Sequence, residues 1–462
     1  MKIAVIGGGG ISSLLSGLKE HDIRVTAIAS VFDSGGSSGG LREEMDIAAV
    51  GDIRQCISSL SSPQTAGRLE ERFSSGSLKG HTAGNLLLAS LIYLLGDAGK
   101  AADMACGLFD VKGDVLPISA DKSSLCAKLD DGRVIAGEAN IDKPAGDEIL
   151  KIAGVFLEPK AMIFPKARDA IEEADAIVIG PGDLYTSLIP NMLVEGFREA
   201  IGKSRAKKIY VCNLWGKRSE SYGYTASMYA DVIGKYMGCM PDYILCNTVA
   251  GKTGGAVAVD KKKLAGMGMK VIEMEFQKGL EHDGKKLAGC IMDIARKHMK
   301  LVIFDLDDTL FSRSLQIKGH LEADIEKEIE DIRLFPGAKD VLDAKGFRKA
   351  LVTSGERERQ EKKINVLGIR DKFDWILICE KDEDKKACFE RIADKYGIER
   401  NNVFVAGNRI DSEIRHANML GMQSILFVHG LYSDLEPKDI MEIPKYKIKK
   451  LSDILKIVRV KV

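Results

Sequence analysis

The sequence lacks a charge excess of either sign. Lysine plus arginine and aspartate plus glutamate both total 67, so the formal net charge is zero. Such a chain has no overall field that would attract nucleic acid or an anionic membrane surface. We therefore expect neither as a partner.

Long apolar runs and ordered cysteine patterns are also missing. The longest apolar run, residues 86–95, is about half of the ~20 residues that a transmembrane helix needs. The chain opens directly on the strand-like KIAVIG, without the basic segment and cleavage site of a signal peptide. The nine cysteines include no CxxC pair, which argues against a disulfide framework or a zinc knuckle. These absences predict a cytoplasmic protein with reduced thiols and no membrane span.

The sequence does contain a repeated alternation of short apolar strands and longer helical segments. Its 462 residues suggest two or three domains. Strands buried on both faces between helices form parallel sheets. We expect two α/β domains of Rossmann-like, three-layered architecture, at residues 1–298 and 299–462. The expected strands begin at residues 2, 23, 174, 207, 243 and 270 in the first domain, and at 301, 348, 373, 402 and 423 in the second.

One segment of the first domain departs from this alternation. In CAKLDDGRVIAGEANI, Asp131 and Gly132 form a two-residue turn between extended arms. This pattern predicts a β-hairpin added to the parallel sheet. The apolar LLLASLIYLL suits a subunit interface as well as a core, which leaves a homo-oligomer open.

A pair of aspartates follows the first strand of the second domain. In FDLDDTL, Asp305 and Asp307 are two residues apart at a strand end, where the strand's period of two points both side chains to one face. Ligands of open parallel sheets bind beyond the carboxyl ends of the strands. The pattern indicates a metal and phosphoryl site.

FDLDDTL resembles the first motif, DxDxT, of the haloacid dehalogenase (HAD) superfamily of phosphohydrolases, and the resemblance extends from about Lys300 to Val458. It implies that Asp305 is a nucleophile forming an aspartyl-phosphate, that Asp307 is the general acid and base, and that Thr309 supports the loop. It further implies that Thr353 holds the substrate phosphate, and that Mg²⁺ is bound by Asp305, Asp307 and Asn408.

The sequence leaves two residues of the site implied by the HAD resemblance undecided. The lysine that neutralises the phosphate is one of Lys381, Lys385 and Lys386, and the spacing to the following helix favours Lys385. Asn408 stands where an aspartate is commoner; an amide oxygen ligates Mg²⁺ but adds no negative charge. Asp411 and Glu413 are then alternative ligands, and a HAD fold without catalysis is the alternative for the whole domain.

The cap of this domain is expected to be minimal. Between Leu310 and Pro336 there is space for one helical piece, with Leu321, Ile325, Ile329 and Ile332 on one apolar stripe. A nearly uncapped site admits water unless a neighbour covers it.

Two glycine-rich stretches follow the first two strands of the first domain. IGGGGISS, with Gly8, Gly9 and Gly10, supplies backbone N–H groups at a helix N-terminus, which suit a phosphate. In VFDSGGSSGG, a flexible loop is expected after Asp33, with Gly35 and Gly36 allowing close approach and with hydroxyls at Ser34, Ser37 and Ser38. Two such loops facing one crevice favour a nucleotide diphosphate compound.

Further stretches place polar groups in the first turns of apolar helices near strand ends. They are VGDIRQCISSL, GHTAGNLLLASL and IGPGDLYTSLIPNML, and a fourth polar stretch is CNLWGKRSESYGYTAS. The candidate ligand-binding residues in them are Asp52, Arg54, His81, Asn85, Gly180, Gly182, Asp183, Tyr185, Thr186 and Asn213.

Together with VFDSGGSSGGLREE, these stretches resemble the gluconeogenesis-factor (YvcK-like) family, which shares its fold with the 2-phospho-L-lactate transferases (CofD-like). The resemblance spans residues 2 to about 250, and it implies a CofD-like fold and a UDP-sugar ligand, UDP-N-acetylglucosamine foremost, in a regulatory role. Ser34 stands where the family usually has a second aspartate.

Two functions follow as alternatives. One is a nucleotide-sugar-binding regulatory domain joined to a Mg²⁺-dependent HAD phosphatase that acts on a small phosphate ester. The other is a group transferase of the 2-phospho-L-lactate transferase type, which uses a nucleotide-activated donor and carries an accessory or inactive HAD domain.

Overall fold

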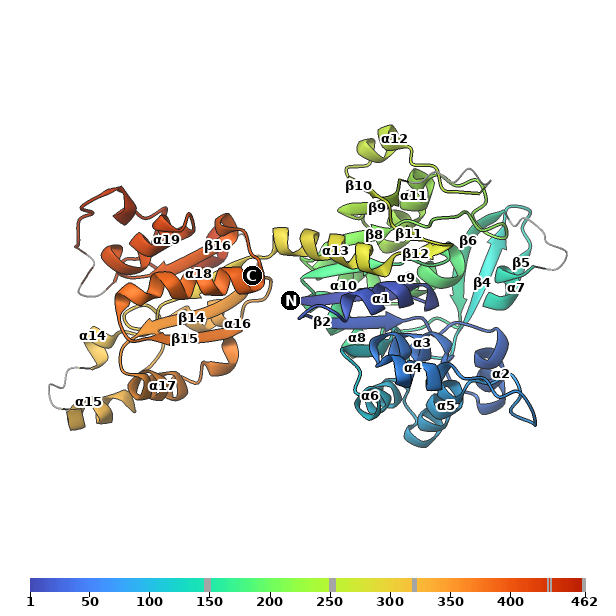
Figure 1. Ribbon diagram of the computed structural model, residues 1–462, viewed down its shortest axis with the longest axis horizontal. Helices are drawn as coiled ribbons and strands as arrows, with labels where there is room; N and C mark the ends of the chain where they lie inside the picture. The colour runs from blue at the N-terminus through green and yellow to red at the C-terminus, as the bar shows by residue number, and fades with distance from the viewer. Residues whose placement is uncertain (145–150, 249–254, 318–321, 430–431, 433, 459–462) are drawn as a thin grey trace. The chain divides into compact units, whose positions relative to one another are not determined.

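The computed structural model describes residues 1–144, 151–248, 255–317, 322–429, 432 and 434–458. The chain divides into two compact units, Met1–Met292 and Asp293–Val462 (Figure 1). The division falls inside helix α13 (Gly284–His298), and the boundary expected at residue 298 is the end of that helix. Each unit is described separately below.

The first unit contains a seven-stranded sheet in which every pair of neighbours is parallel. Its central strands are buried on both faces, as the apolar runs predicted. In sheet order the strands are β10 (Lys270–Met274), β9 (Tyr243–Asn247), β8 (Lys207–Val211), β7 (Ala176–Ile179), β1 (Lys2–Gly7), β2 (Arg24–Ala29) and β3 (Asp114–Pro117).

The strand order reverses at β1. The chain first adds β2 and β3 on one side of β1 and later places β7 on the other side. Ile6 lies beside Ile28 of β2 and Ile179 of β7, so the loops after these three strands leave the sheet at one edge. Such a reversal opens a crevice beyond the strand ends.

Helices pack on both faces of this sheet (Figure 1). They are α1 (Ser12–Leu18), α2 (Gly36–Met45), α3 (Gly51–Leu60), α4 (Pro63–Glu70), α5 (Ala83–Leu95), α6 (Ala98–Leu108), α7 (Glu138–Asp142), α8 (Pro165–Glu173), α9 (Ile189–Met192), α10 (Phe197–Lys203), α11 (Ala226–Met237), α12 (Lys261–Gly266) and α13. None of the helices in the described ranges is long and apolar enough to cross a membrane.

The expected hairpin is confirmed. β4 (Ser124–Leu129) and β5 (Val134–Ala136) are antiparallel, and the Gly132 amide donates to the Leu129 carbonyl at 3.0 Å. β6 (Ile152–Glu158), a strand the sequence did not predict, completes a three-stranded sheet on the other side of β4. A short ribbon of β11 (Gln277–Lys278) and β12 (Glu281–His282) precedes α13.

The second unit contains a six-stranded, all-parallel sheet whose order also reverses at its first strand. The order is β15 (Trp375–Cys379), β14 (Arg348–Ser354), β13 (Leu301–Phe304), β16 (Val403–Gly407), β17 (Gln423–Phe427) and β18 (Tyr446–Ile448). Phe304 lies beside Leu351 of β14 and Ala406 of β16. The ends of β13, β14 and β16 therefore converge, as the motif order predicted.

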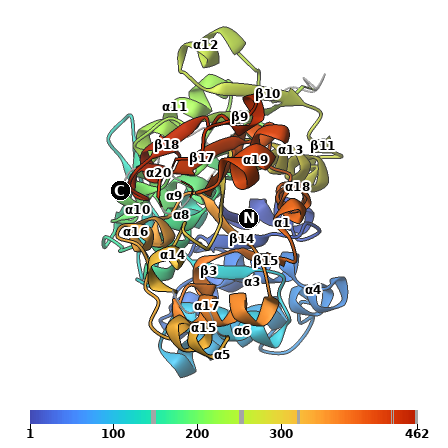
Figure 2. The same cartoon turned by 90° about the vertical axis from the view of Figure 1, so that its left-hand side faces the viewer.

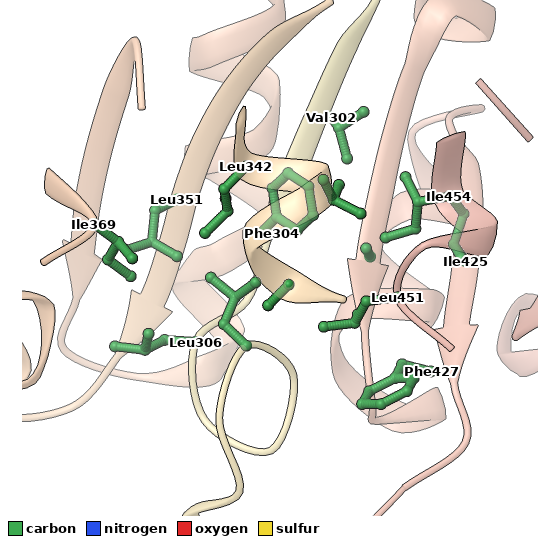
Figure 3. Packing of buried hydrophobic residues seen from close by; sticks show 14 of the residues in the cluster. Val302, Phe304, Leu306, Leu342, Leu351, Ile369, Ile425, Phe427, Leu451 and Ile454 are labelled. Carbon is green, nitrogen blue, oxygen red and sulfur yellow. The ribbon is translucent and has the colours of Figure 1, made fainter. Parts of the chain in front are cut away.

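Helices cover both faces of this second sheet. α18 and α19 pack on one face, and α16 and α20 lie on the other (Figure 2). The helices are α14 (Arg313–Gln316), α15 (Glu322–Ile329), α16 (Ala338–Asp343), α17 (Arg357–Val366), α18 (Lys385–Tyr396), α19 (Arg415–Met419) and α20 (Asp453–Ile457). Figure 3 shows the core beneath α16 and α20, where Phe304, Leu342 and Ile454 point toward one another.

The cap segment contains two helices, α14 and α15, where the sequence analysis expected one. α14 is a four-residue turn, too short to show as a periodic stripe. Ile329 and Ile332 are buried and Ile325 packs against the core, in agreement with the expected stripe, while Leu321 lies outside the described residues.

A glycine contact joins α1 to the start of α13. A methyl group at Gly284 would overlap the Ser13 carbonyl, whereas one at Gly289, in the same helix, would meet nothing within 4 Å. Overpacking of this kind costs about 1–3 kcal/mol, and Gly to Ala in an open helical position gains up to about 1 kcal/mol. We expect Gly284→Ala to lower the first unit's free energy of unfolding and Gly289→Ala to leave it equal or higher, in denaturant titrations. Equal effects would contradict the close α1–α13 contact.

Candidate functional site

The second unit holds a buried lysine and carboxylate pair beyond its central strand. Asp305 follows β13, and its amide donates to the Ala406 carbonyl of β16 at 3.0 Å. Lys385, at the start of α18, donates from Nζ to Asp305 Oδ1 at 2.8 Å. The two side chains are 6 % and 3 % exposed, so the ion pair is formed in a medium that screens it poorly. Of the three lysines left open by the sequence, Lys385 is the one that lies beside Asp305.

Glu413 completes a cage around this lysine. Its Oε1 accepts from Lys385 Nζ at 2.5 Å, and its Oε2 accepts from the Arg409 amide at 3.2 Å. Gly407 is required here because a Cβ at that position would overlap the Glu413 side chain. Asn408 follows directly and is 3 % exposed. Glu413, which follows β16, is thereby joined to Asp305 through Lys385.

Asp382 is the third carboxylate near Lys385, and it also bonds to Arg409 and to the Ser354 hydroxyl. Lys385 Nζ lies 3.1 Å from Asp382 Oδ1, to which the Ser354 hydroxyl also donates. Arg409 donates to Asp382 and to both oxygens of Asp411, the latter at 3.1 and 3.0 Å. Asp411 is therefore paired with arginine and does not join the group around Asp305.

Asp307 pairs with a different lysine, Lys363. Lys363 of α17, 2 % exposed, donates to both of its oxygens at 2.8 and 2.9 Å, and Gln360 Nε2 lies 3.3 Å from Oδ2. Neither partner was predicted from the sequence, because both lie in the charged stretch ERERQEKK, which carries no motif. Their burial depends on how α17 packs, which no local pattern indicates.

In this cage the pKa values of both Asp305 and Lys385 are raised. Burial raises the pKa of Asp305 to about 7; Lys385 opposes the rise, whereas Glu413 adds to it. The pKa of Lys385 is raised above its ordinary value, since the carboxylates of Asp305, Glu413 and Asp382 outweigh the opposing effect of burial. The site is thus a lysine ammonium held among more carboxylates than it can neutralise.

The two threonines expected in this site lie at the same edge. Thr309 Oγ1 is 3.4 Å from Asp305 Oδ2, which is a weak contact. Thr353 lies near the end of β14, two residues past Leu351, the partner of Phe304, and is 1 % exposed. Asp305, Thr353, Lys385 and Asn408 are therefore brought to one edge of the sheet.

In the first unit the two glycine-bearing loops at the strand reversal touch each other. A side chain at Gly10 would overlap the Pro181 carbonyl and Gly182, and one at Gly8 would approach Asp52 and Ser187. At Gly9 a Cβ would overlap Gln55 of α3. These glycines therefore serve close packing between the β1 and β7 loops, and Gly180 adopts φ +78°.

The stretch after Asp33 is helical where a flexible loop was expected. Gly36, at φ +52°, begins α2, and Gly39 packs so closely that a side chain would overlap the Ser34 carbonyl. Ser38 Oγ accepts from the amides of Val50 and Gly51 at 3.1 and 3.0 Å and so caps the start of α3. Glycine and serine have low helix propensity, so tertiary contacts override the local preference here.

Hydroxyl and amide groups form a chain beside this helix. Arg54 Nε donates to Asn85 Oδ1 at 2.9 Å, Asn85 Nδ2 donates to Ser37 Oγ at 3.0 Å, and Ser37 Oγ lies 3.0 Å from His81 Nδ1. Thr82 caps α5 by accepting from the Asn85 amide. Four of the sequence-predicted binding residues are thus joined in one network.

Carboxylates gather at the same crevice. The Gly35 amide donates to Asp33 Oδ1 at 2.8 Å, and the Ser34 amide lies 3.4 Å from Glu138 Oε2. Burial, with the nearby Asp33 charge, raises the pKa of Asp52 to about 7 and that of Glu138 to about 8. Glu138, the first residue of α7 after the hairpin, carried no motif and was missed. When ionised, these carboxyls would repel an anion, and a bound cation would offset that charge.

A lysine cage lies beyond β7 and β8. Lys217 donates to Asp142, to Asp183 at 2.5 Å and lies 3.2 Å from Glu220. Glu220 also accepts from the Tyr185 amide at 2.6 Å and from the Thr186 hydroxyl at 3.0 Å. Asn213 Nδ2 donates to the Gly182 carbonyl at 2.9 Å. Within the described ranges, Asp142, Asp183 and Glu220 also form the carboxylate group compact enough for a metal ion, although Lys217 already lies in it.

The fold and its strand-end loops match known families. Residues 3–277 match the family model described as 2-phospho-L-lactate transferase CofD, and residues 314–421 match the haloacid dehalogenase-like hydrolase model. The second match begins after Asp305. The chain is a parallel-sheet α/β protein that belongs to the CofD family.

Within that family its relatives are gluconeogenesis factors. It is 37 % identical over 316 residues to the gluconeogenesis factor of Bacillus subtilis, covering 64 % of this chain and 98 % of that one. It is 39 % identical over 311 residues to that of Halalkalibacterium halodurans, covering 63 % and 95 %. A crystal structure of a UPF0052-family protein from Bacillus halodurans superposes with a TM-score of 0.60 at 37 % identity, covering 63 % of this chain and 99 % of that one. The recognised CofD-like and HAD-like parts are both confirmed.

The raised pKa of Asp52 predicts a pH-dependent stability. Its folded-state pKa of about 7 lies above the unfolded value of ~3.9, so the wild type loses stability as pH rises between these values. Asp52→Asn has no such charge. We expect its free energy of unfolding, relative to the wild type, to increase by about 2 kcal/mol from pH 5 to pH 8. The matched control is Asp22→Asn, an exposed carboxylate of the same unit; the same pH response in both variants would contradict the crowding of carboxylates at the crevice.

Proposed function

We propose that the second unit is a Mg²⁺-dependent phosphohydrolase that acts on small phosphate esters. The observation that carries the proposal is the Lys385–Asp305 contact of 2.8 Å at the strand reversal. A carboxylate nucleophile needs a cation beside it, because the attacked phosphoryl group is itself negatively charged. Lys385 supplies that charge from a buried, fixed position.

The residues at this edge divide the reaction among them. Asp305 attacks phosphorus and forms an aspartyl-phosphate, the ester oxygen leaves with a proton from Asp307, and water then releases inorganic phosphate. Thr353 holds a phosphate oxygen, and Lys385 neutralises the charge. Lys363 fixes both oxygens of Asp307 and so orients that carboxylate.

The donor set suits Mg²⁺. Asp305 Oδ1 is taken by Lys385, but among the described residues Oδ2 has only the 3.4 Å contact with Thr309. The raised pKa of Asp305, caused by burial and Glu413 against the pull of Lys385, marks a carboxylate that a further cation would stabilise. Asp305 and the Asn408 amide would hold the ion, and oxygen ligands of this kind are those that Mg²⁺ prefers. When bound, Mg²⁺ would neutralise charge on the phosphoryl oxygens.

Removal of the nucleophile tests this proposal. We expect the full-length wild type to hydrolyse members of a phosphate-ester panel with Mg²⁺ and Asp305→Asn to lose at least about 10³-fold in kcat, since an amide cannot form the acyl phosphate. The measurement is phosphate release in a colorimetric assay. Asp394→Asn, an exposed carboxylate on α18, is the matched control and should stay within about twofold of the wild type.

Equal inertness of the wild type and Asp305→Asn across the panel would refute the hydrolase proposal. It would leave the alternative, in which the first unit is a transferase acting on a nucleotide-activated donor and the HAD-like unit is accessory.

We propose further that the first unit binds a nucleotide diphosphate compound of the UDP-sugar type as a regulatory ligand. The glycine loops after β1 and β7, the hydroxyl of Ser37 and the polar chain from Arg54 to His81 support this. The carboxylates of Asp33, Asp52 and Glu138 favour binding of the diphosphate together with a divalent cation.

Calorimetry tests the ligand class. We expect UDP-N-acetylglucosamine with Mg²⁺ to bind more tightly than GDP or NAD, and Ser37→Ala to weaken binding by about tenfold, since it removes one hydrogen-bonding group worth about 1.4 kcal/mol. Ser90→Ala, an exposed serine on α5, is the control and should bind as the wild type does. Failure of all three nucleotides to bind would refute the proposal.

A further inference from the structure

Two cysteines of the second unit lie in direct contact. Cys379 is the last residue of β15, Cys388 lies in the first turns of α18, and their Sγ atoms are 2.9 Å apart. Nothing in the sequence indicated this pair, because eight residues lie between the two positions and no CxxC is present. The fold brings them together since α18 returns along β15 after a short turn.

The two thiols differ in access and in acidity. Cys379 is 6 % exposed, whereas Cys388 is partly exposed. The hydrogen bond from Cys379 lowers the pKa of Cys388 to about 7 against the effect of burial, and it raises the pKa of Cys379. Cys388 is therefore the thiol that reagents reach and the one that ionises near neutral pH, and thiolates are the attacking species in thiol–disulfide exchange.

We propose that Cys379 and Cys388 are a modification site at which a reversible intramolecular disulfide forms. The oxidant is a low-molecular-weight disulfide such as glutathione disulfide. The Cys388 thiolate attacks one glutathione sulfur, the glutathione S–S bond breaks, and one glutathione thiolate leaves. Cys379 then loses its proton and attacks the Cys388 sulfur, which releases the second glutathione. Two electrons and two protons pass from the pair to one glutathione disulfide, which becomes two glutathione molecules.

A disulfide between these two cysteines would close a ring that includes a residue of the candidate active site. The closed ring contains the turn η5 (Asp382–Asp384) and Lys385, the residue bound to Asp305. The Cys379 carbonyl also accepts from the Gly355 amide at 2.9 Å, beside Ser354, which bonds Asp382. Oxidation therefore cross-links the segment that carries Lys385, and reduction releases it. The proposal does not depend on which reaction the site performs.

Mass spectrometry of the native full-length protein tests the proposal. The protein is treated with glutathione disulfide at neutral pH, quenched with acid, alkylated and digested. We expect a peptide pair joined through Cys379 and Cys388 that dithiothreitol separates. In Cys379→Ser, Cys388 should instead retain a glutathione adduct, because the resolving thiol is missing. In Cys388→Ser, Cys379 should be alkylated only after denaturation.

Internal controls are provided by other cysteines of the same chain. Cys239 is exposed, but partial burial raises the pKa of its thiol, so in the wild type and in both variants it should take up glutathione, more slowly than Cys388 does where Cys388 is present, while the buried Cys56 should carry none. A wild type in which Cys388 keeps a stable glutathione adduct, or in which both thiols stay free while Cys239 reacts, would overturn the proposal. So would a Cys379→Ser variant in which Cys388 remains unmodified.

Discussion

The reversal of strand order at the first strand of each parallel sheet is the constraint on which both candidate sites depend. In the first unit β1 lies between β2 and β7, and in the second β13 lies between β14 and β16. Neighbouring loops diverge to opposite faces at such a reversal and leave room beyond the strand ends. Gly10 touches the Gly182 loop at one reversal, and Asp305 meets Lys385 at the other.

The two sites share one electrostatic design. Each holds a lysine among three carboxylates: Lys217 with Asp142, Asp183 and Glu220, and Lys385 with Asp305, Asp382 and Glu413. The excess of negative charge raises the pKa of each lysine and keeps it protonated. They differ in burial, since Lys217 is 24 % exposed and Lys385 only 3 %. The ammonium of Lys385 is accordingly fixed more firmly and screened less.

Much of this arrangement follows from the sequence, because short continuous apolar runs and glycine-rich strand ends are local features. They predicted the strands beginning at Lys2 and Leu301, the Asp131–Gly132 turn and the place of Asp305. Contacts between residues that are far apart in the sequence leave no pattern in the local sequence. Ser38 lies in a helix against its own propensity and caps α3, Lys363 is buried by the packing of α17, and Glu138 reaches the crevice from α7, the helix after the hairpin. β3 (Asp114–Pro117) and β18 (Tyr446–Ile448) are short, and nothing in their composition marked them as strands.

If the strand ends of the second unit form the proposed phosphoryl-transfer site, the phosphoryl group passes through Asp305, and locating that group during turnover is the sharpest test. The protein is mixed with Mg²⁺ and a hydrolysed phosphate ester, quenched in acid within the first turnover, and digested for mass spectrometry. We expect an acid-stable, base-labile phosphoryl group on the Asp305 peptide. Phosphate release with the label on another residue, or with no covalent label in the first turnover, would contradict it.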